Sequence, residues 1–161
     1  MLTEILNQIP LEIFAQLALA TLLGACIGVE RELARKTAGM RTFALVALGS
    51  CLFTIIPQIA FLNFGGTSYD PSRIASQVVV GIGFIGAGLI VFHQSRVRGL
   101  TTAAGLWVSA AIGMAVAYKL YAIAIFSTLI TIFILVFLWL IEHRIVKKFG
   151  NRVADAEHDD E

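Results

Sequence analysis

The sequence has little charge. Only 14% of its 161 residues are Asp, Glu, Lys or Arg, while 58% are hydrophobic. A soluble domain usually carries about 25% charged residues, so one domain of this length has too few polar groups to cover a surface in water. The net charge of +1 also gives none of the bulk basic character that binds nucleic acid. We therefore expect the lipid bilayer, and no nucleic acid, to surround the chain.

The sequence also lacks the common motifs of catalysis and metal binding. It has no H-E-x-x-H, no G-x-S-x-G and no paired carboxylates within a helix. His93 has no second His, Cys or carboxylate at helical spacing that would complete a metal site. The two cysteines, Cys26 and Cys51, are expected at different membrane depths, and therefore as reduced, packed thiols. These absences predict neither an enzyme nor a cofactor.

Long apolar runs are what the sequence does have. Five runs approach the length of about 20 residues that crosses a bilayer, at about 11–29, 42–62, 74–92, 100–118 and 120–141. Because lipid offers backbone groups no hydrogen bonds, each run should be a helix. The sequence predicts an all-α polytopic membrane protein, with a compact five-helix bundle over residues 1–142 and a tight hairpin at "YKLY". A basic juxtamembrane segment and a disordered acidic tail should follow at 143–161.

The basic residues predict the orientation of the bundle. Of the 12 Lys and Arg residues, 10 lie in residues 30–41, 96–98 and 144–152. These segments follow the first, third and fifth apolar runs, so all three lie on the same side of the membrane. The positive-inside rule then puts the C-terminus in the cytoplasm and the N-terminus outside. The leader before Leu11 has no basic residue, so we expect it to be retained and not cleaved as a signal peptide.

A glycine motif occurs inside the third apolar run. The stretch "VVVGIGFIGAGLIVFH" contains G-x-G-x-x-G, but a nucleotide site would need an acidic residue about 20 positions later, and none lies between Pro71 and Ile141. The glycines instead predict close helix packing, with the third helix at the centre of the bundle and the bulky fifth helix facing lipid. A broken helix that offers carbonyls to an ion or substrate is the alternative. The expected packing glycines are Gly24, Gly28, Gly81, Gly83, Gly86, Gly88, Gly105 and Gly113.

Charged residues gather after the first apolar run, in "GVERELARKTAGMRTFALVALGS". Glu32 and Lys36 can pair at i,i+4 if the helix continues, and Ala38-Gly39 should end it. Glu30 lies near the hydrocarbon boundary, where a carboxylate requires a partner. The arginines expected on the same side are Arg31, Arg41, Arg96 and Arg98. We expect a Glu–Arg network there, either as a structural latch or as a binding site.

Two other connections carry polar residues. In "YDPSRIASQ", Asp70 should cap the third helix with Pro71 at its first position. Alternatively, Asp70 attracts a cation, and a polar path continues through Gln77 with Gln16 and Gln58. In "HQSRVRGLTTAAGLW", Thr101 and Thr102 either cap the fourth helix or line a site beside Arg98.

Three blocks of the sequence resemble the MgtC/SapB (YhiD-like) family of bacterial inner-membrane proteins. They are "GVERELARKTAGMRTFALVALGS", "DPSRIASQVVVGIGFIGAGLI" and "VRGLTTAAGLWVSAAIGMAVAY". The resemblance covers Leu22 to Tyr118. The matching motif positions are Glu30, Arg31, Glu32, Gly39, Arg41, Thr42, Asp70, Arg73, Gln77, Gly81, Gly83, Gly86, Gly88, Gly99, Thr101, Thr102 and Trp107.

The resemblance implies a role in growth at low magnesium. It also implies a regulator that binds other membrane machines, including the proton-translocating ATP synthase. A virulence role is not inherited with the resemblance, because several members have a C-terminal domain where this chain has a short tail. The first hypothesis is a regulator that acts by helix contact with a larger complex or with a second copy. The alternative is a small oligomeric channel or transporter for magnesium or another cation, with Asp70, Gln77 and the Glu30–Arg41 cluster along its path.

Overall fold

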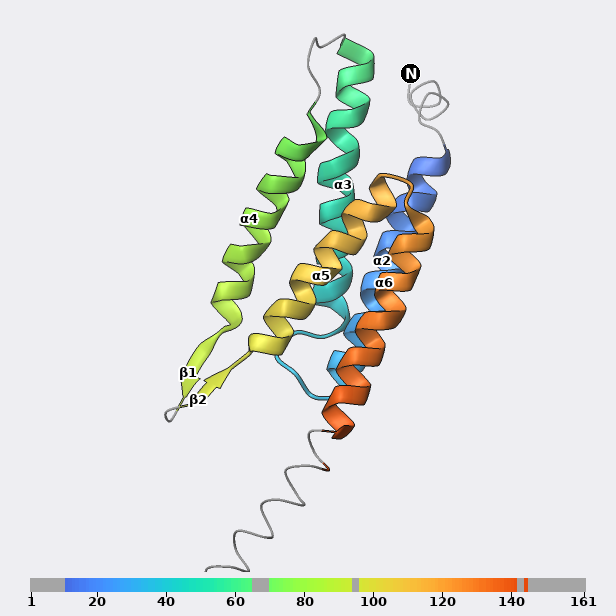
Figure 1. Cartoon of the computed structure of the whole chain (residues 1–161). Coiled ribbons are helices and arrows are strands. Elements are labelled where there is room, and N and C mark those ends of the chain that lie inside the picture. Colours follow the sequence, from blue (N-terminus) through green and yellow to red (C-terminus); the bar gives the residue numbers. More distant parts are fainter. Residues whose placement is uncertain (1–10, 65–69, 94–95, 142–143, 145–161) are drawn as a thin grey trace, which may run out of the picture.

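The computed structural model describes residues 11–64, 70–93, 96–141 and 144. Its elements are α2 (Leu11–Leu33), α3 (Met40–Phe64), α4 (Pro71–Leu89), β1 (Val91–His93), β2 (Arg96–Arg98), α5 (Leu100–Ala117) and α6 (Tyr121–Phe133), which continues through the π-helical segment η1 (Ile134–Leu138) to Ile141 (Figure 1). Five helices are long and apolar enough to cross a membrane, as predicted. The chain is an all-α polytopic membrane protein, apart from one short hairpin.

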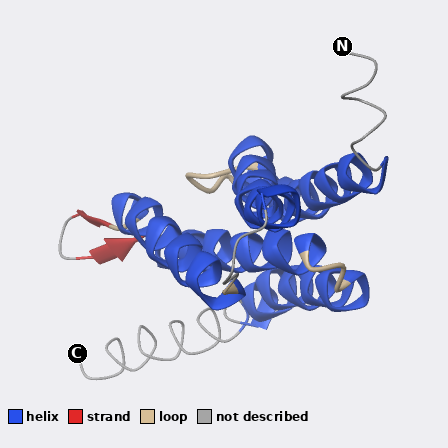
Figure 2. Ribbon diagram, turned by 90° about the horizontal axis from the view of Figure 1, so that it is seen from above, coloured by secondary structure: helices blue, strands red, loops and turns tan. Residues whose placement is uncertain are grey.

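The β1–β2 hairpin was not predicted. Val91 pairs with Arg98 and Phe92 with Val97 in two antiparallel strands, which Figure 2 shows at one side of the helices. The third helix therefore ends at Leu89, three residues before the predicted limit. Val and Phe favour extended backbone, and the hairpin satisfies their backbone groups where the apolar run meets its polar end.

Two helices end in the same way, with a non-glycine residue in the left-handed conformation. Arg35 has φ 53° after α2, and Lys119 has φ 61° after α5. In each case the next residue donates its N–H five residues back, from Lys36 to Arg31 and from Leu120 to Ala115, at 2.9 Å. This is the Schellman motif. It forms the tight "YKLY" hairpin as predicted, but it ends α2 at Leu33, so the predicted stop at Ala38-Gly39 is wrong.

The fourth span, α5, lies at the centre of the bundle. Of its membrane window 56% is buried, against 11% for α4. Helices α2, α3 and α6 surround α5, whereas α4 stands at the edge and packs mainly on α5 (Figure 1). The prediction that the third helix is central is therefore wrong. Only Ile82 and Gly86 of the described α4 residues are buried, because α4 meets the bundle along one narrow line.

The glycines fall into two groups. A Cβ at Gly113 would lie 2.2 Å from the carbonyl oxygen of Ala47, and one at Gly24 would lie 2.6 Å from that of Phe43. Gly28 and Gly105 also touch α3 closely, at Met40 and Phe43. Gly24, Gly28 and Gly113 let their helices approach the backbone of α3, and Gly105 makes room for the ring of Phe43. By contrast, a Cβ at Gly81, Gly83 or Gly88 would meet no described atom within 4 Å, and one at Gly86 would meet only Ala103, at 3.6 Å.

Buried polar groups in the bundle are bonded across or along helices. Gln16 donates from Nε2 to the carbonyls of Val116 and Ala117 at 3.0 and 3.1 Å, where α5 ends. The Val116 carbonyl also accepts the backbone N–H of Lys119 at 2.9 Å. Ser109 donates to the carbonyl of Phe43 at 3.0 Å and links α5 to α3. The bulky side chains of α6 are largely exposed, as a lipid-facing helix requires. Both cysteines are free, with Cys51 buried as expected but Cys26 exposed, so the expectation that Cys26 is packed is wrong.

Candidate functional sites at the ends and on one face of the bundle

The predicted Glu–Arg network is reduced to one pair. The end of the bundle that holds the α2–α3 connection, the β1–β2 hairpin and residues 138–141 is called the basic end below. Here Arg31, only 3% exposed, donates from Nε and Nη2 to its neighbour Glu30, with Nη2 to Oε1 at 2.6 Å. Arg41 and Arg98 form no ion pair with any described carboxylate. The side chain of Arg96 lies outside the described residues.

Glu32 organises the α2–α3 connection and does not pair with Lys36. Its Oε2 accepts the backbone N–H of Met40 at 3.0 Å, which satisfies a free donor at the start of α3. A Cβ at Gly39 would approach that same oxygen to 2.8 Å, so glycine keeps the space for the carboxylate. The predicted i,i+4 pair is wrong because the helix ends at Leu33, before it reaches Lys36.

A cavity of about 680 Å³, named the basic-end cavity, lies beside the buried arginine. It brings Arg31 together with Thr101 and Thr102 but not with Arg98. Gly99, in the left-handed conformation at φ 93°, is the N-cap of α5, and no side chain caps this helix. A Cβ at Gly99 would lie 2.0 Å from the carbonyl oxygen of Leu89. The remaining lining residues were not expected beside Arg31, and they are Lys36, Val97, Gly99, Leu100, Ile134, Leu135, Leu138 and Trp139.

Asp70 caps α4 at the opposite end. Its Oδ1 accepts the backbone N–H of Ser72 at 2.9 Å and the Ser72 hydroxyl at 2.6 Å, with Pro71 at the first helical position. Nε of Arg73 lies 3.8 Å from Oδ2. The hydrogen bonds from Ser72 hold the pKa of Asp70 below its usual range, and Arg73 adds to the effect.

An ion pair at this same end was not predicted. Nζ of Lys119 lies 2.8 Å from Oε2 of Glu12, and the Tyr121 hydroxyl lies 3.4 Å from Oε1. The pair joins the start of α2 to the α5–α6 turn, residues that are far apart in the chain. The hydrogen bond to Glu12 raises the pKa of Lys119.

The three glutamines of the expected polar path do not lie along one route. Gln16 is buried between α2 and α5, and Gln58 donates to the carbonyl of Thr54 at 3.0 Å within its own helix. Gln77 is exposed on α4 and lines a separate cavity. That expectation is therefore wrong: the side chains face three different environments. Helix α4 is also continuous from Pro71 to Leu89, so the alternative of a helix broken at its glycines is wrong as well.

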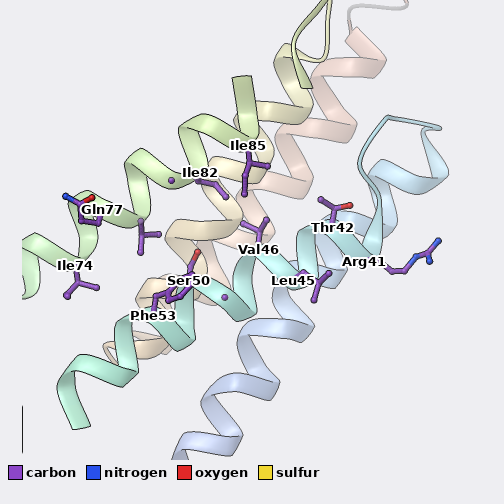
Figure 3. A pocket seen from close by; sticks show the side chains of 13 residues that line it. Arg41, Thr42, Leu45, Val46, Ser50, Phe53, Ile74, Gln77, Ile82 and Ile85 are labelled. Carbon is purple, nitrogen blue, oxygen red and sulfur yellow. The ribbon is translucent and has the colours of Figure 1, made fainter. Parts of the chain in front are cut away.

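The second cavity, named the α3–α4 groove, has a volume of about 730 Å³. Figure 3 shows Ile82 and Ile85 of α4 facing Val46 of α3, with Gln77 and Arg41 at opposite ends of the row. Thr42 and Ser50 are the other polar side chains, and Gly49 and Gly81 open onto it. An apolar groove between two poorly packed helices suits an apolar occupant better than an ion.

No group of three or more His, Cys, Asp or Glu side chains that could hold a metal ion occurs among the described residues. The side chain of His93 lies outside them.

A family model, the MgtC family, matches residues 17–144. The chain belongs to the MgtC family. It is 43% identical over 127 residues to the Escherichia coli K12 protein named "Putative magnesium transporter YhiD", covering 77% of this chain and 59% of that one. It is 38% identical to SapB of Bacillus subtilis, covering 86% and 60%, and 47% identical to MgtC of Salmonella typhimurium LT2, covering 69% and 46%. No solved structure matches.

The chain spans about half to three fifths of the length of these MgtC family relatives. The matched part is the membrane part, and the protein is a multi-pass inner-membrane protein. The three sequence blocks that carried the resemblance have distinct places in the fold. The first and third meet at the basic-end cavity, and the second forms the peripheral helix α4.

Proposed function

We propose that this MgtC family protein is a regulator in magnesium homeostasis, which acts by placing α4 against a membrane helix of a larger complex. The name of the Escherichia coli relative supports the link to magnesium. The geometry of α4 supports contact with a partner helix more than ion conduction through the chain. The proton-translocating ATP synthase is the first complex to test, and a second copy of this chain is the alternative partner.

The observation that carries the proposal is the unused glycine surface of α4. A Cβ at Gly81, Gly83 or Gly88 would meet no described atom within 4 Å, whereas Gly24, Gly28 and Gly113 are packed against the backbone of a neighbouring helix or connection. Glycine inside a helix costs about 1 kcal/mol relative to alanine, and no packing within the described chain offsets that cost here. Small residues on a membrane helix let a second backbone approach closely. A partner helix would give these glycines the contact that Gly24 and Gly113 already have.

The interior of the bundle supports a regulator more than a channel. Its buried glutamine and serine bond to backbone carbonyls, and Phe43 and Leu106 fill its centre with no exposed surface. The cavity beside α4 is mainly apolar. A cation would find few ligands along either route, since hard cations prefer several oxygen ligands.

The test is association after Gly83→Leu. Gly83 is the suitable position because a side chain there meets no described atom, whereas Gly86 touches Ala103 within the chain. Ala111→Leu, on the exposed face of α5, is the matched control. Both variants should fold and insert. We expect Gly83→Leu alone to lose the ATP synthase, or another complex that purifies with the native chain, and to lose growth at low magnesium. Equal association of the two variants would refute the proposed contact.

Ion flux through the purified chain in liposomes tests the channel alternative. Asp70→Asn is the useful variant, because asparagine keeps the N-cap of α4 while removing the carboxylate that was expected to attract a cation there. The proposal predicts no magnesium flux for either protein. Flux that Asp70→Asn abolishes would overturn the proposal in favour of a transporter.

A further inference from the structure

The start of α5 presents unsatisfied donors to the basic-end cavity. The backbone N–H groups of Leu100, Thr101 and Thr102 precede the first helical hydrogen bond, which runs from Ala103 to Gly99 at 2.9 Å. Gly99 has no side chain with which to cap them. The same three residues line the cavity. The positive end of the dipole of an 18-residue helix therefore faces this space.

A buried hydroxyl in the cavity has no hydrogen-bond partner within the described part of the chain. Thr102 is 3% exposed, and its Oγ1 bonds to no described group. Other threonines of the bundle, such as Thr54 and Thr128, donate to the carbonyl four residues earlier at 2.8 and 2.9 Å. No helical carbonyl lies four residues before Thr102, because α5 begins only two residues before it. A buried hydroxyl is costly without a partner, so this one points to a missing acceptor or donor.

Two cationic side chains line the same space, one of them paired with Glu30. Glu30 occupies Nε and Nη2 of Arg31, which leaves Nη1 of this buried guanidinium for another acceptor. Lys36 lines the cavity and pairs with no described carboxylate. Glu32 is used at Met40 and does not line the cavity. A helix N-terminus, two cations and a hydroxyl are the recognition elements of a phosphate.

The η1 side of the cavity lining is apolar. Ile134, Leu135 and Leu138 of η1 line it together with Trp139. A free anion would gain nothing from this wall, whereas an acyl chain would cover it. Tryptophan also favours the level of the lipid headgroups. We propose that the basic-end cavity binds an anionic phospholipid, with its phosphate at the start of α5 and an acyl chain along η1.

The experiment measures lipid binding by the purified full chain in nonionic detergent, using native mass spectrometry. The probe is dioleoyl phosphatidylglycerol, and dioleoyl phosphatidylcholine, with the same acyl chains, is the matched lipid. Thr102→Val keeps the shape of the side chain and removes the hydroxyl. We expect it to bind phosphatidylglycerol about tenfold more weakly, the usual effect of losing one hydrogen bond to a charged group. Thr128→Val, also a buried threonine, should bind as the native chain does.

Two further arms make the outcome decisive. Lys36→Gln changes an exposed residue and should fold, and it should also weaken phosphatidylglycerol binding while phosphatidylcholine binding stays low. Inorganic phosphate and glycerol 3-phosphate at millimolar concentration should displace little lipid. Full displacement by either one would identify a site for free phosphate and overturn the lipid assignment. Equal binding by the native chain, Thr102→Val and Lys36→Gln would overturn the site itself.

Discussion

Alanine at Gly113 should destabilise the bundle far more than alanine at Gly81. At Gly113 the new Cβ would lie 2.2 Å from the carbonyl oxygen of Ala47, while ordinary van der Waals contact lies at 3.4–4 Å. That carbonyl belongs to helix backbone, so α5 and α3 must separate. Overpacking of this kind costs about 1–3 kcal/mol. Separation would also stretch the bond from Ser109 to Phe43, worth about another 1 kcal/mol.

At Gly81 the same substitution meets no described atom, so only the backbone effect remains. Alanine is favoured over glycine inside a helix by about 1 kcal/mol, and Gly81→Ala should therefore be neutral or more stable. The same gain applies to Gly113→Ala, so the two variants should differ by the packing and hydrogen-bond effects alone, about 3 kcal/mol in the free energy of unfolding. Reversible unfolding in mixed micelles, followed by circular dichroism, measures the difference. Equal stability of Gly113→Ala and the native chain would refute the close packing of α5 on α3.

Three further predictions concern single residues. Because the pKa of Asp70 is lowered in the folded state, its contribution to stability should be complete above the ordinary value of 3.8 and lost as the pH falls through the folded value. The free energy of unfolding, measured against pH, should show this loss for the native chain and not for Asp70→Asn. Arg35→Gly should stabilise the chain by about 1 kcal/mol in chemical unfolding, because glycine adopts a φ of 53° without strain; a loss would mean that the arginine side chain matters more. Gln16→Leu should cost about 1 kcal/mol by the same measurement, since it removes the hydrogen bonds that Gln16 donates to the carbonyls of Val116 and Ala117; no change would show that water replaces the glutamine.

The features that local sequence determines could be predicted. Five apolar runs of membrane length gave five helices, because lipid leaves the backbone no other structure. Asp70 followed by Pro71 predicted the start of α4, and the short gap between apolar runs at Lys119 predicted the α5–α6 hairpin. Each of these depends on neighbours within a few positions in the chain.

The arrangement of the helices could not be predicted in the same way. Both α4 and α5 carry small residues, and which of them lies in the centre depends on the faces of all five helices together. The ends of α2 and α4 were misplaced because tertiary contacts decided them: Glu32 reaches Met40, and β1 pairs with β2. The pair of Glu12 and Lys119 joins residues too distant in sequence for any local pattern.

The candidate sites were predicted in part. The sequence brought attention to Arg31, Thr101 and Thr102, which line one cavity. It gave no signal that Lys36 and the η1 segment complete that cavity, because they come from opposite ends of the chain. It also suggested packing within the chain for the glycines of α4, where the structure leaves three of them open.

Site-specific photocrosslinking tests the central claim most directly. A photoreactive phenylalanine analogue at Phe84, which is 84% exposed beside the α4 glycines, is compared with one at Phe126, which is 66% exposed on α6. If α4 contacts a partner helix, Phe84 should give one defined membrane-protein adduct, which is absent from Phe126 and lost when Gly83→Leu is added. Adducts of the same kind from both positions, or a Phe84 adduct that survives Gly83→Leu, would contradict that contact.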